Sequence, residues 1–395
     1  MNAIRLFEFF SGIGSQYKAL KNIAKNSKLE IISSGCCEWY IDAIVSYLTI
    51  HYGELKPETE LTREQMSKIL NNYTFSADSK TPVSNNFFIK SKNLSKIFPY
   101  LYAFVNNDYF NKVYKTNKKL ENYTDITKVD NLQSNIDIMT YSFPCQDLSQ
   151  QGKQKGLEKG TRSGLLYEIE RILLNSKHKP KVLILENVKA LTTKKFINNF
   201  LDWVKTLENL GYSTSFQTLN SSNFGSSQNR ERVFAVSILN NQINEKFDFN
   251  NLQRKEPKKV SSIVKESNVG IDCSNLIDKY KLTPFNTSIN GINKARLINY
   301  SNFNSETYVY LTNDKGPTLT ASGANSRLKF YFPEKNKLRY INACEAIQYM
   351  GFDKKDYLQI KKSELVTENK IIFLSGNSIS VEVLEAIFNE VVKWF

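Results

Sequence analysis

Apolar and polar residues along this chain form a pattern typical of strands separated by amphipathic helices. The first apolar run, 4–10, passes through a glycine turn into a helix with one apolar face. Further runs rich in strand-forming residues follow at 29–38, 135–143, 181–188, 213–220 and 232–239. Helical patterns at 164–175 and 196–211 separate several of these runs. This alternation predicts an α/β protein with a doubly wound, mostly parallel sheet.

Two segments interrupt the alternation. A Lys/Asn-rich stretch between Glu38 and Asp125 is too long for one crossover, so we expect a helical insertion at about 55–120. From about 240 the chain becomes polar, and glycine-punctuated aromatic segments then predict a smaller mixed or β-rich domain. The last segment is expected to return to the first domain through a strand near 371–374, a turn and a helix. The predicted organisation is a first domain at 1–250, a smaller domain at 251–340 and a returning segment at 341–395.

The first two predicted strands end in residues suited to a nucleoside cofactor. Gly12 and Gly14 follow the first strand and allow close approach of a ligand, whereas Glu38 ends the second and can accept ribose hydroxyls. A dinucleotide site would need a small residue three positions after Gly14, where this chain has Tyr17, so NAD is disfavoured. Trp39 offers an aromatic face to an adenine, although such a tryptophan is more often part of the core.

Cys145 follows Pro144 directly after the predicted strand 135–143, which the proline ends. A cysteine on a loop at this edge of the sheet is a candidate nucleophile, although a small buried thiol is the commoner explanation for a single cysteine. The only histidines are His51 and His178, so a histidine base for this thiol is not evident. Five cysteines without paired spacing also argue against a disulfide framework and a zinc site, and no metal is expected.

The charge balance of the chain predicts a class of binding partner. Lys and Arg number 53 against 39 Asp and Glu, a net charge of +14, which predicts binding to a polyanion such as nucleic acid. Part of the excess is explained by a composition rich in Asn, Lys and Ile, as an A/T-rich coding sequence produces. No window has the roughly 20 apolar residues of a membrane span, and the start lacks the pattern of a cleavable signal. We therefore expect a cytoplasmic protein with reduced cysteines.

Several short motifs, taken in order, resemble those of the DNA (cytosine-5) methyltransferase family. They are "FFSGIG" (9–14), Glu38-Trp39, Asp125-Ile126, "FPCQDLS" (143–149), "ENV" (186–188), "QNRER" (228–232), "RYINACEAIQYMGF" (339–352) and "GNSISV" (376–381). The match covers nearly the whole chain, and the shared order is far more specific than any one motif. Four positions depart from the usual family residues without removing a reacting group, namely Glu8, Ser11, Ser15 and Ser380.

The resemblance implies a Rossmann-like sheet that binds S-adenosylmethionine (SAM) and a separate target-recognition domain. It implies methyl transfer to C5 of cytosine in double-stranded DNA, with S-adenosylhomocysteine as product. Cys145 would add to C6, Glu186 would hydrogen bond N3, and Arg230 would contact the base near O2. Arg232, also placed among the catalytic residues, would orient its strand together with Gln228. An ordinary ion pair for Glu186, and a purely structural role for Arg232 and Gln228, stay open. The cofactor residues implied are Phe10, Gly12, Ile13, Gly14, Glu38, Trp39, Asp125, Ile126, Pro144, Asn377 and Ser378.

The same resemblance extends to DNA recognition. The target cytosine must leave the duplex to react, and we expect the basic, glycine-rich loop after Cys145 to close over the DNA rather than serve as a linker. Segment 302–327 resembles the recognition segment of the CpG-specific methyltransferases of mollicutes, so CpG is the predicted site. Phe303 is a candidate apolar wedge at that step. The DNA contacts implied are Gln146, Ser149, Phe303, Ser322, Gly323, Ala324 and Arg327.

Three other functions remain to be weighed. A tRNA methyltransferase of the same fold is the nearest, but the 107 positions between Arg232 and Arg339 favour a DNA-recognition domain. A non-catalytic DNA-binding module would show damaged motifs, and a NAD-dependent oxidoreductase leaves "FPCQD" unexplained. We expect a bacterial, nucleoid-associated monomer with no obligate protein partner and no membrane. Whether a partner restriction enzyme exists stays open.

Overall fold

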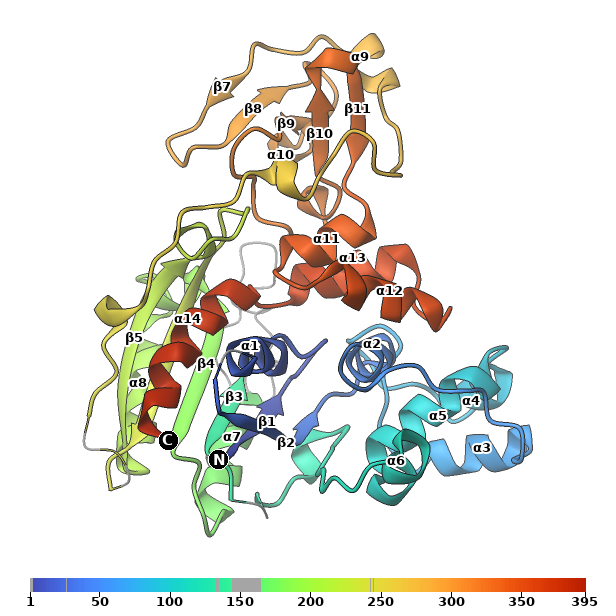
Figure 1. The fold of residues 1–395 in the computed structure, drawn as a ribbon, viewed down its shortest axis with the longest axis vertical. Helices are drawn as coiled ribbons and strands as arrows, with labels where there is room; N and C mark the ends of the chain where they lie inside the picture. Colours follow the sequence, from blue (N-terminus) through green and yellow to red (C-terminus); the bar gives the residue numbers. More distant parts are fainter. Residues whose placement is uncertain (1–2, 26, 133–134, 144–164, 242, 244) are drawn as a thin grey trace. The chain divides into compact units, whose positions relative to one another are not determined.

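The computed structural model describes residues 3–25, 27–132, 135–143, 165–241, 243 and 245–395 (Figure 1). The chain forms two compact units, each of which is described by itself. The first unit comprises Met1–Leu219, Glu231–Leu252 and Ile387–Phe395. The second comprises Asn220–Arg230 and Gln253–Ala386. The domain limits expected from the sequence stay a prediction.

A six-stranded sheet with the order β2-β1-β3-β4-β6-β5 forms the centre of the first unit. The four strands from β2 to β4 are parallel, and β6 pairs with β4 in the antiparallel direction. The predicted doubly wound, mostly parallel sheet is therefore confirmed. The strands are β1 (Ala3–Phe9), β2 (Glu30–Cys37), β3 (Ile138–Tyr141), β4 (Val182–Val188), β5 (Tyr212–Asn220) and β6 (Glu231–Leu239).

The central strands are apolar on both faces because the sheet is covered on both sides. In β4, the four residues Val182 to Leu185 are each at most 2% exposed. One covering layer consists of α7 (Leu166–Asn175) and α8 (Ile197–Asn209), whose apolar faces share a core with β1, β3 and β4. Two further helices of this unit follow β1 and β2, namely α1 (Ser15–Ala24) and α2 (Ile41–Tyr52).

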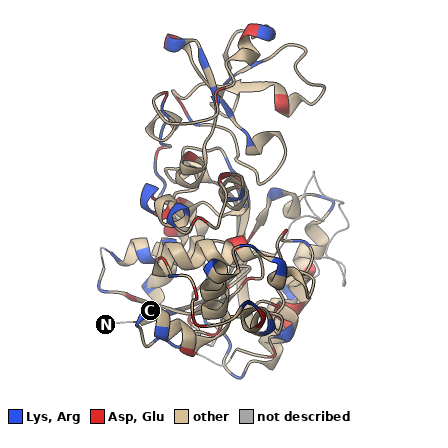
Figure 2. Cartoon of the chain, turned by 90° about the vertical axis from the view of Figure 1, so that its right-hand side faces the viewer, with Lys and Arg blue, Asp and Glu red and all other residues tan. Residues whose placement is uncertain are grey.

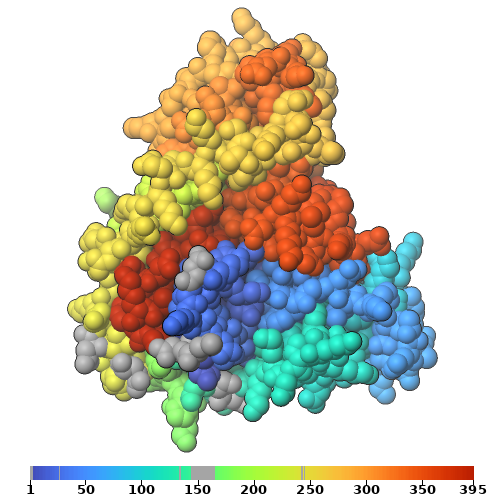
Figure 3. Space-filling view, viewed as in Figure 1, coloured from blue at the N-terminus to red at the C-terminus, as the bar shows by residue number. Residues whose placement is uncertain are grey.

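The stretch 55–120 contains four helices, in line with the expected helical character, and its status as an insertion stays a prediction. It forms part of the surface of the first unit, coloured light blue to teal in Figure 3. Its first helix begins with a capping box, in which the Thr62 hydroxyl accepts from the Gln65 amide and the Gln65 side chain accepts from the Thr62 amide. The helices are α3 (Arg63–Leu70), α4 (Phe87–Lys90), α5 (Leu94–Val105) and α6 (Asn107–Tyr114).

The second unit contains a five-stranded sheet with the order β11-β10-β9-β8-β7. Its strands pair in the antiparallel direction except for β9 and β10, so the expected small mixed sheet is confirmed. The strands are β7 (Asn286–Thr287), β8 (Asn293–Arg296), β9 (Tyr308–Tyr310), β10 (Lys329–Phe332) and β11 (Lys337–Tyr340). The helices are α9 (Asn275–Lys279), α10 (Asn304–Thr307), α11 (Ala343–Tyr349), α12 (Lys354–Lys362), α13 (Glu368–Asn377) and α14 (Val381–Val391), which continues into the first unit.

Short 3-10 turns connect many of these elements. They are η1 (Ile126–Lys128), η3 (Lys189–Thr192), η4 (Ser221–Asn223), η5 (Phe249–Asn251), η6 (Val260–Ser262), η7 (Ala324–Ser326), η8 (Pro333–Lys335) and η9 (Val392–Trp394).

The strand predicted near 371–374 is wrong, because these residues belong to α13. The Thr367 side chain caps this helix by accepting a hydrogen bond from the Lys370 amide, and the buried Ile371 and Leu374 lie one turn apart. A run of four apolar residues fits a strand or a helix, and here the cap decides for the helix. Within the described ranges no single helix has the length and apolar character to cross a membrane. Only α13 and the stretch Val381–Trp394 together pass that test, as a pair bent by 41°.

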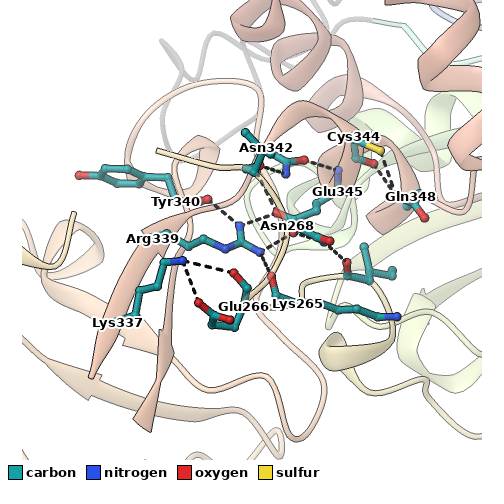
Figure 4. Close-up of polar contacts among 12 residues, drawn as sticks. Lys265, Glu266, Asn268, Lys337, Arg339, Tyr340, Asn342, Cys344, Glu345 and Gln348 are labelled. Atoms are coloured by element: carbon teal, nitrogen blue, oxygen red, sulfur yellow. Dashed lines mark hydrogen bonds and ion pairs between the residues drawn. The ribbon is translucent and has the colours of Figure 1, made fainter. Parts of the chain in front are cut away.

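A buried ion pair joins β11 to α11 in the second unit (Figure 4). Arg339 donates from Nη1 to Oε2 of Glu345 at 2.8 Å and from Nη2 to Oε1 at 2.5 Å, and both side chains are 1% exposed. The Asn268 side chain and the Asn342 amide also donate to this carboxylate, at 2.8 and 3.0 Å. Arg339 reaches the carbonyl of Lys265 as well, at 2.5 Å. The pair therefore fixes two segments that are far apart in the sequence, 265–268 and 339–345.

We expect Arg339→Met to lower the free energy of unfolding by about 3 to 5 kcal/mol, because Glu345 is left buried without its cation. Adding Glu345→Leu to this variant should recover most of the lost free energy of unfolding, since no buried charge then remains at this pair. The measurement is urea denaturation followed by circular dichroism. Lys337→Met is the control, because its pair with Glu266 is about one third exposed and screened by solvent, so its loss should change the stability little. Equal instability of the single and double variants would contradict the prediction.

Candidate active site

The turn between β1 and α1 has an unusual backbone, with positive φ at Phe10 (56°), Gly12 (54°) and Gly14 (77°). A Cβ at Gly14 would lie 2.6 Å from the Tyr47 ring and would also collide with His51, so only glycine fits there. A Cβ at Gly12 would meet nothing within 4 Å. The backbone at Gly12 is therefore open to a ligand, whereas Gly14 anchors the turn against α2.

Glu38, the residue after β2, holds this turn through its carboxylate. The Gly12 amide donates to Oε2 at 2.9 Å, and the amides of Trp39 and Tyr40 both donate to Oε1 at 2.8 Å. Burial raises the pKa of Glu38, and these amide hydrogen bonds oppose the rise. A carboxylate accepts about four hydrogen bonds, so part of its capacity remains for a ribose hydroxyl. Trp39 is half-buried beside it.

The segment before η1 lies alongside the end of β2. Glu38 donates its amide to the Tyr123 carbonyl at 2.9 Å, and Tyr123 donates to Cys36 at 2.9 Å. Two residues further on, Asp125 caps η1 by accepting from the Thr127 amide and hydroxyl, at 3.0 and 2.7 Å. The structure thus brings the two predicted cofactor segments, Glu38-Trp39 and Asp125-Ile126, to one edge of the sheet.

Glu186 and Arg232 lie together on adjacent strands of the first unit. Arg232 Nε is 3.3 Å from Glu186 Oε1, and the side chains are 19% and 11% exposed, respectively. The pair forms across β4 and β6, where Arg232 lies opposite Val188 in the antiparallel register. An ion pair was one of the roles left open for Glu186. Both charged groups retain some access from outside, so a ligand can reach them.

The next residue along β4 ties this pair to the segment that leads to the predicted nucleophile. Asn187 is 2% exposed, and its Nδ2 donates to the Phe143 carbonyl at 3.2 Å. Phe143 is the last described residue before Pro144 and Cys145. The predicted site residues Pro144, Cys145, Gln146 and Ser149 lie outside the described residues.

Arg230 is placed differently from Arg232, although only one residue separates them. Arg230 lies in the second unit, is 4% exposed, and donates from Nη1 to the Leu319 carbonyl at 2.8 Å. Its Nη2 donates to the carbonyls of Gly376 and Ser378, at 3.1 and 2.9 Å. Gln228 reinforces this arrangement by donating to the Tyr349 carbonyl at 2.8 Å and accepting from the Leu319 amide at 3.1 Å. These contacts favour a positioning role for both residues.

The predicted residues of the "GNSISV" motif lie at the end of α13. Asn377 is exposed, whereas Ser378 is 7% exposed and its hydroxyl donates to the Leu374 carbonyl at 2.9 Å. A Cβ at Gly376 would collide with the backbone of Thr320 and Ala321, so glycine allows that segment to approach the helix. The cofactor contacts expected of Asn377 and Ser378 stay a prediction.

The predicted DNA contacts of the second unit are on exposed turns. Phe303 is 70% exposed at the start of α10. Gly323 has a φ of 76° before η7, and hydrogen bonds from Ser326 to Gly323 and from Arg327 to Ala324, both 3.1 Å, close that turn. Ser322, Gly323 and Arg327 are exposed, and Ala324 is half-buried. The elements α10 and η7 lie next to each other.

A buried polar network beneath the first turn was not predicted from the sequence. Glu8 is fully buried, and it accepts from the Tyr47 hydroxyl at 2.8 Å and from the Tyr17 amide at 3.2 Å. Burial raises its pKa from 4.5 to about 7, against the effect of these two hydrogen bonds. His51 Nε2 lies 3.1 Å from the Ile13 carbonyl, between the rings of Tyr17 and Tyr47. The only available signal was the acid at position 8 in an apolar strand.

Comparisons with known proteins found a matching family and several similar chains. The family described as C-5 cytosine-specific DNA methylase matches residues 88–393. The chain is 43% identical to the orphan methyltransferase M.SssI of Spiroplasma monobiae, over 98% of this chain and 97% of that protein. It is 32% identical to the type II methyltransferase M2.ScrFI of Lactococcus lactis subsp. cremoris, over 99% of both. The Dnmt2 methyltransferase of S. pombe shares the fold, with a TM-score of 0.60, 16% identity and coverage of 99% and 98%.

The Glu8 environment predicts a pH dependence of stability. A carboxyl group with a raised folded pKa stabilises the fold fully below pH 4.5, and this contribution is lost as pH rises toward 7. Because a difference of one pH unit between the folded and unfolded pKa corresponds to about 1.4 kcal/mol, the loss of stability reaches about 3 kcal/mol at most. Glu8→Gln should therefore show a smaller fall in thermal midpoint between pH 5 and pH 7.5 than the unaltered protein. The exposed Glu60→Gln should keep the original slope. The same slope in Glu8→Gln would rule out this contribution.

Proposed function

The chain belongs to the C-5 cytosine-specific DNA methylase family, and on this premise we propose how its own residues divide the reaction. It is a DNA cytosine-5 methyltransferase that uses SAM as methyl donor. The observation that carries the assignment is the Glu186–Arg232 pair, held next to the segment that leads to Cys145 by the Asn187–Phe143 hydrogen bond.

We assign the cofactor to the first turn and the adjoining end of β2. The open backbone at Gly12 allows close approach, and Glu38 keeps acceptor capacity for a ribose hydroxyl. When bound, SAM supplies an electrophilic methyl group on its sulfonium. Trp39 is available beside Glu38 for the adenine. The other residues proposed to contact SAM are Phe10, Ile13, Gly14, Asp125, Ile126, Pro144, Asn377 and Ser378.

Carbon 5 of cytosine is too weak a nucleophile to take the methyl group unaided, so the proposed route is covalent. The Cys145 thiolate forms a bond to C6, and the displaced electron pair makes C5 nucleophilic. C5 would then form a bond to the methyl group supplied by SAM, and the methyl–sulfur bond would break to leave S-adenosylhomocysteine. Removal of the C5 proton and cleavage of the C6–S bond restore the ring and the thiolate, leaving 5-methylcytosine.

Glu186 and Arg232 are proposed to hold the base during this addition. A carboxyl group can hydrogen bond N3 and the exocyclic amine, while a guanidinium beside it can donate to O2. Arg232 is the arginine next to Glu186, whereas Arg230 is bonded to buried carbonyls of the second unit. We therefore transfer the O2 contact, which the sequence had placed on Arg230, to Arg232. Arg230 is proposed to position the segment that precedes β6.

The second unit is proposed to read the DNA, with CpG as the target site. Residues 253–340 carry 15 Lys and Arg against 7 Asp and Glu, a net +8 that suits a phosphate backbone. These basic residues are distributed over several strands and loops (Figure 2). Phe303 supplies an exposed apolar side chain for a base step from which the cytosine is flipped. Gln146 and Ser149, which follow Cys145 in the sequence, are proposed as further DNA contacts. We propose that the protein acts as a monomer in the cytoplasm, on nucleoid DNA.

Transfer of tritium from labelled SAM to short duplexes tests substrate and specificity together. We expect label on a CpG duplex, little on a GpC duplex and none on a duplex without cytosine. Cys145→Ala should reduce the label to background, because the covalent step is lost. Label on the GpC duplex would exclude CpG specificity but keep the chemistry. Label on tRNA alone would contradict the DNA assignment.

Substitutions of the two arginines should have different effects, one on the kinetics and the other on the stability. We expect Arg232→Ala to lower kcat by roughly 100-fold or more without altering the KM for SAM, since it removes a group beside the base. Arg230→Ala should instead lower the thermal midpoint, because three buried carbonyls lose their donor. Lys189→Ala is the control. Lys189 follows β4 directly and pairs with Glu231 on β6, and because these side chains are 57% and 43% exposed, the substitution should leave kcat unchanged. Loss of kcat in Arg230→Ala alone, with normal stability, would reverse these roles.

A further inference from the structure

The turn that presents Phe303 is well fixed for an exposed segment. The Phe303 amide donates to the Ser301 hydroxyl at 3.1 Å, and that hydroxyl donates to Glu306 Oε2 at 2.7 Å. The Glu306 amide donates to the Phe303 carbonyl at 2.9 Å. An aromatic side chain that is 70% exposed therefore stands on a closed ring of hydrogen bonds. We call residues 301–307 the Phe303 turn.

A buried lysine forms a hydrogen bond to the end of this turn. Lys329, on β10, is 4% exposed, and its Nζ donates to the Glu306 carbonyl at 2.7 Å. The ammonium also lies 5.5 Å from the centre of the Tyr300 ring and 5.9 Å from that of Tyr340. Burying an ammonium group costs free energy unless the group is hydrogen bonded. The Glu306 carbonyl and the two aromatic rings offset this cost for Lys329. The cation is too deep in the unit to neutralise a phosphate itself.

An arginine from another strand holds the same turn through side chains. Arg296, on β8, donates from Nη2 to Asn304 Oδ1 at 2.6 Å and from Nε to Thr307 Oγ1 at 3.3 Å. The Thr307 hydroxyl in turn donates to the Asn304 carbonyl at 2.8 Å. Two cations from two strands of the sheet thus fix both ends of α10, the helix that follows Phe303.

We propose that Lys329 and Arg296 are positioning residues of DNA recognition, which hold the Phe303 turn in its DNA-binding conformation before the duplex arrives. The inference rests on the proposed role of Phe303. A turn that is ordered in advance does not lose conformational entropy on binding, so the aromatic side chain enters the base step at a lower cost. Neither cation needs to touch the DNA for this effect.

A double-mutant cycle tests the inference, with Lys329→Met and Phe303→Ala made singly and together. Initial methylation rates are measured on a CpG duplex while the concentrations of DNA and SAM are varied separately. Lys329→Met should raise the KM for DNA by about tenfold, in line with the cost of ordering one or two side chains, and leave the KM for SAM unchanged. The KM for DNA of the double variant should be no higher than that of Phe303→Ala alone. Effects that multiply in the double variant would overturn the proposal, because Lys329 would then act independently of Phe303.

Two further variants separate positioning from charge and from folding. Lys294→Met removes a cation of the same sheet that lies 4.3 Å over the Tyr308 ring, and it should show no coupling to Phe303→Ala. Arg296→Lys keeps the charge but loses the fork to Asn304 and Thr307, and it should couple to Phe303→Ala as Lys329→Met does. Coupling in Lys294→Met, or none in Arg296→Lys, would contradict the inference. If a duplex without CpG is labelled instead, the CpG proposal fails, and the same cycle measured on that duplex still decides the role of Lys329 and Arg296.

Discussion

A charged group that is buried away from water must find its partners inside the protein, and this requirement organises both units. In the first unit, Glu8 accepts hydrogen bonds from a tyrosine hydroxyl and a backbone amide beneath the turn proposed to bind the cofactor. In the second, Arg339 and Glu345 satisfy each other, and Lys329 relies on a carbonyl and two aromatic rings. Each group fixes segments that are distant in the chain, so polar satisfaction determines the geometry on which the chemistry depends.

The "QNRER" motif illustrates how closely the two units are linked along the chain. Gln228 and Arg230 belong to the second unit and bond to its carbonyls and amides, whereas Arg232 belongs to the first and pairs with Glu186. The unit boundary falls between them, at the start of β6. The five residues of this motif are therefore divided between two units, and the proposed roles divide in the same way, with positioning at Gln228 and Arg230 and chemistry at Arg232.

Much of the sheet was predictable because buried parallel strands are continuous apolar runs, as in Val182 to Leu185 of β4, and because glycines and acids mark their ends. The orientation of individual side chains was not. Whether Arg230 or Arg232 faces Glu186 depends on where β6 begins, and periodicity fixes such limits only to a few residues. The run at 371–374 was ambiguous for a related reason, since its cap at Thr367 is a local detail. The Glu8 network needed tertiary contacts with α2 that no local pattern encodes.

The two cations beneath the Phe303 turn differ in how much they constrain evolution. Lys329 bonds to the backbone carbonyl of Glu306, so this hydrogen bond does not require a particular side chain at position 306, although the Glu306 carboxylate also accepts from Ser301 within the turn. Arg296 bonds to the side chains of Asn304 and Thr307, and a change at either position removes one of its acceptors. Mutations can therefore accumulate at some positions of this turn while its shape persists. A recognition loop built this way can drift toward new sequence preferences without first losing the fold that supports it.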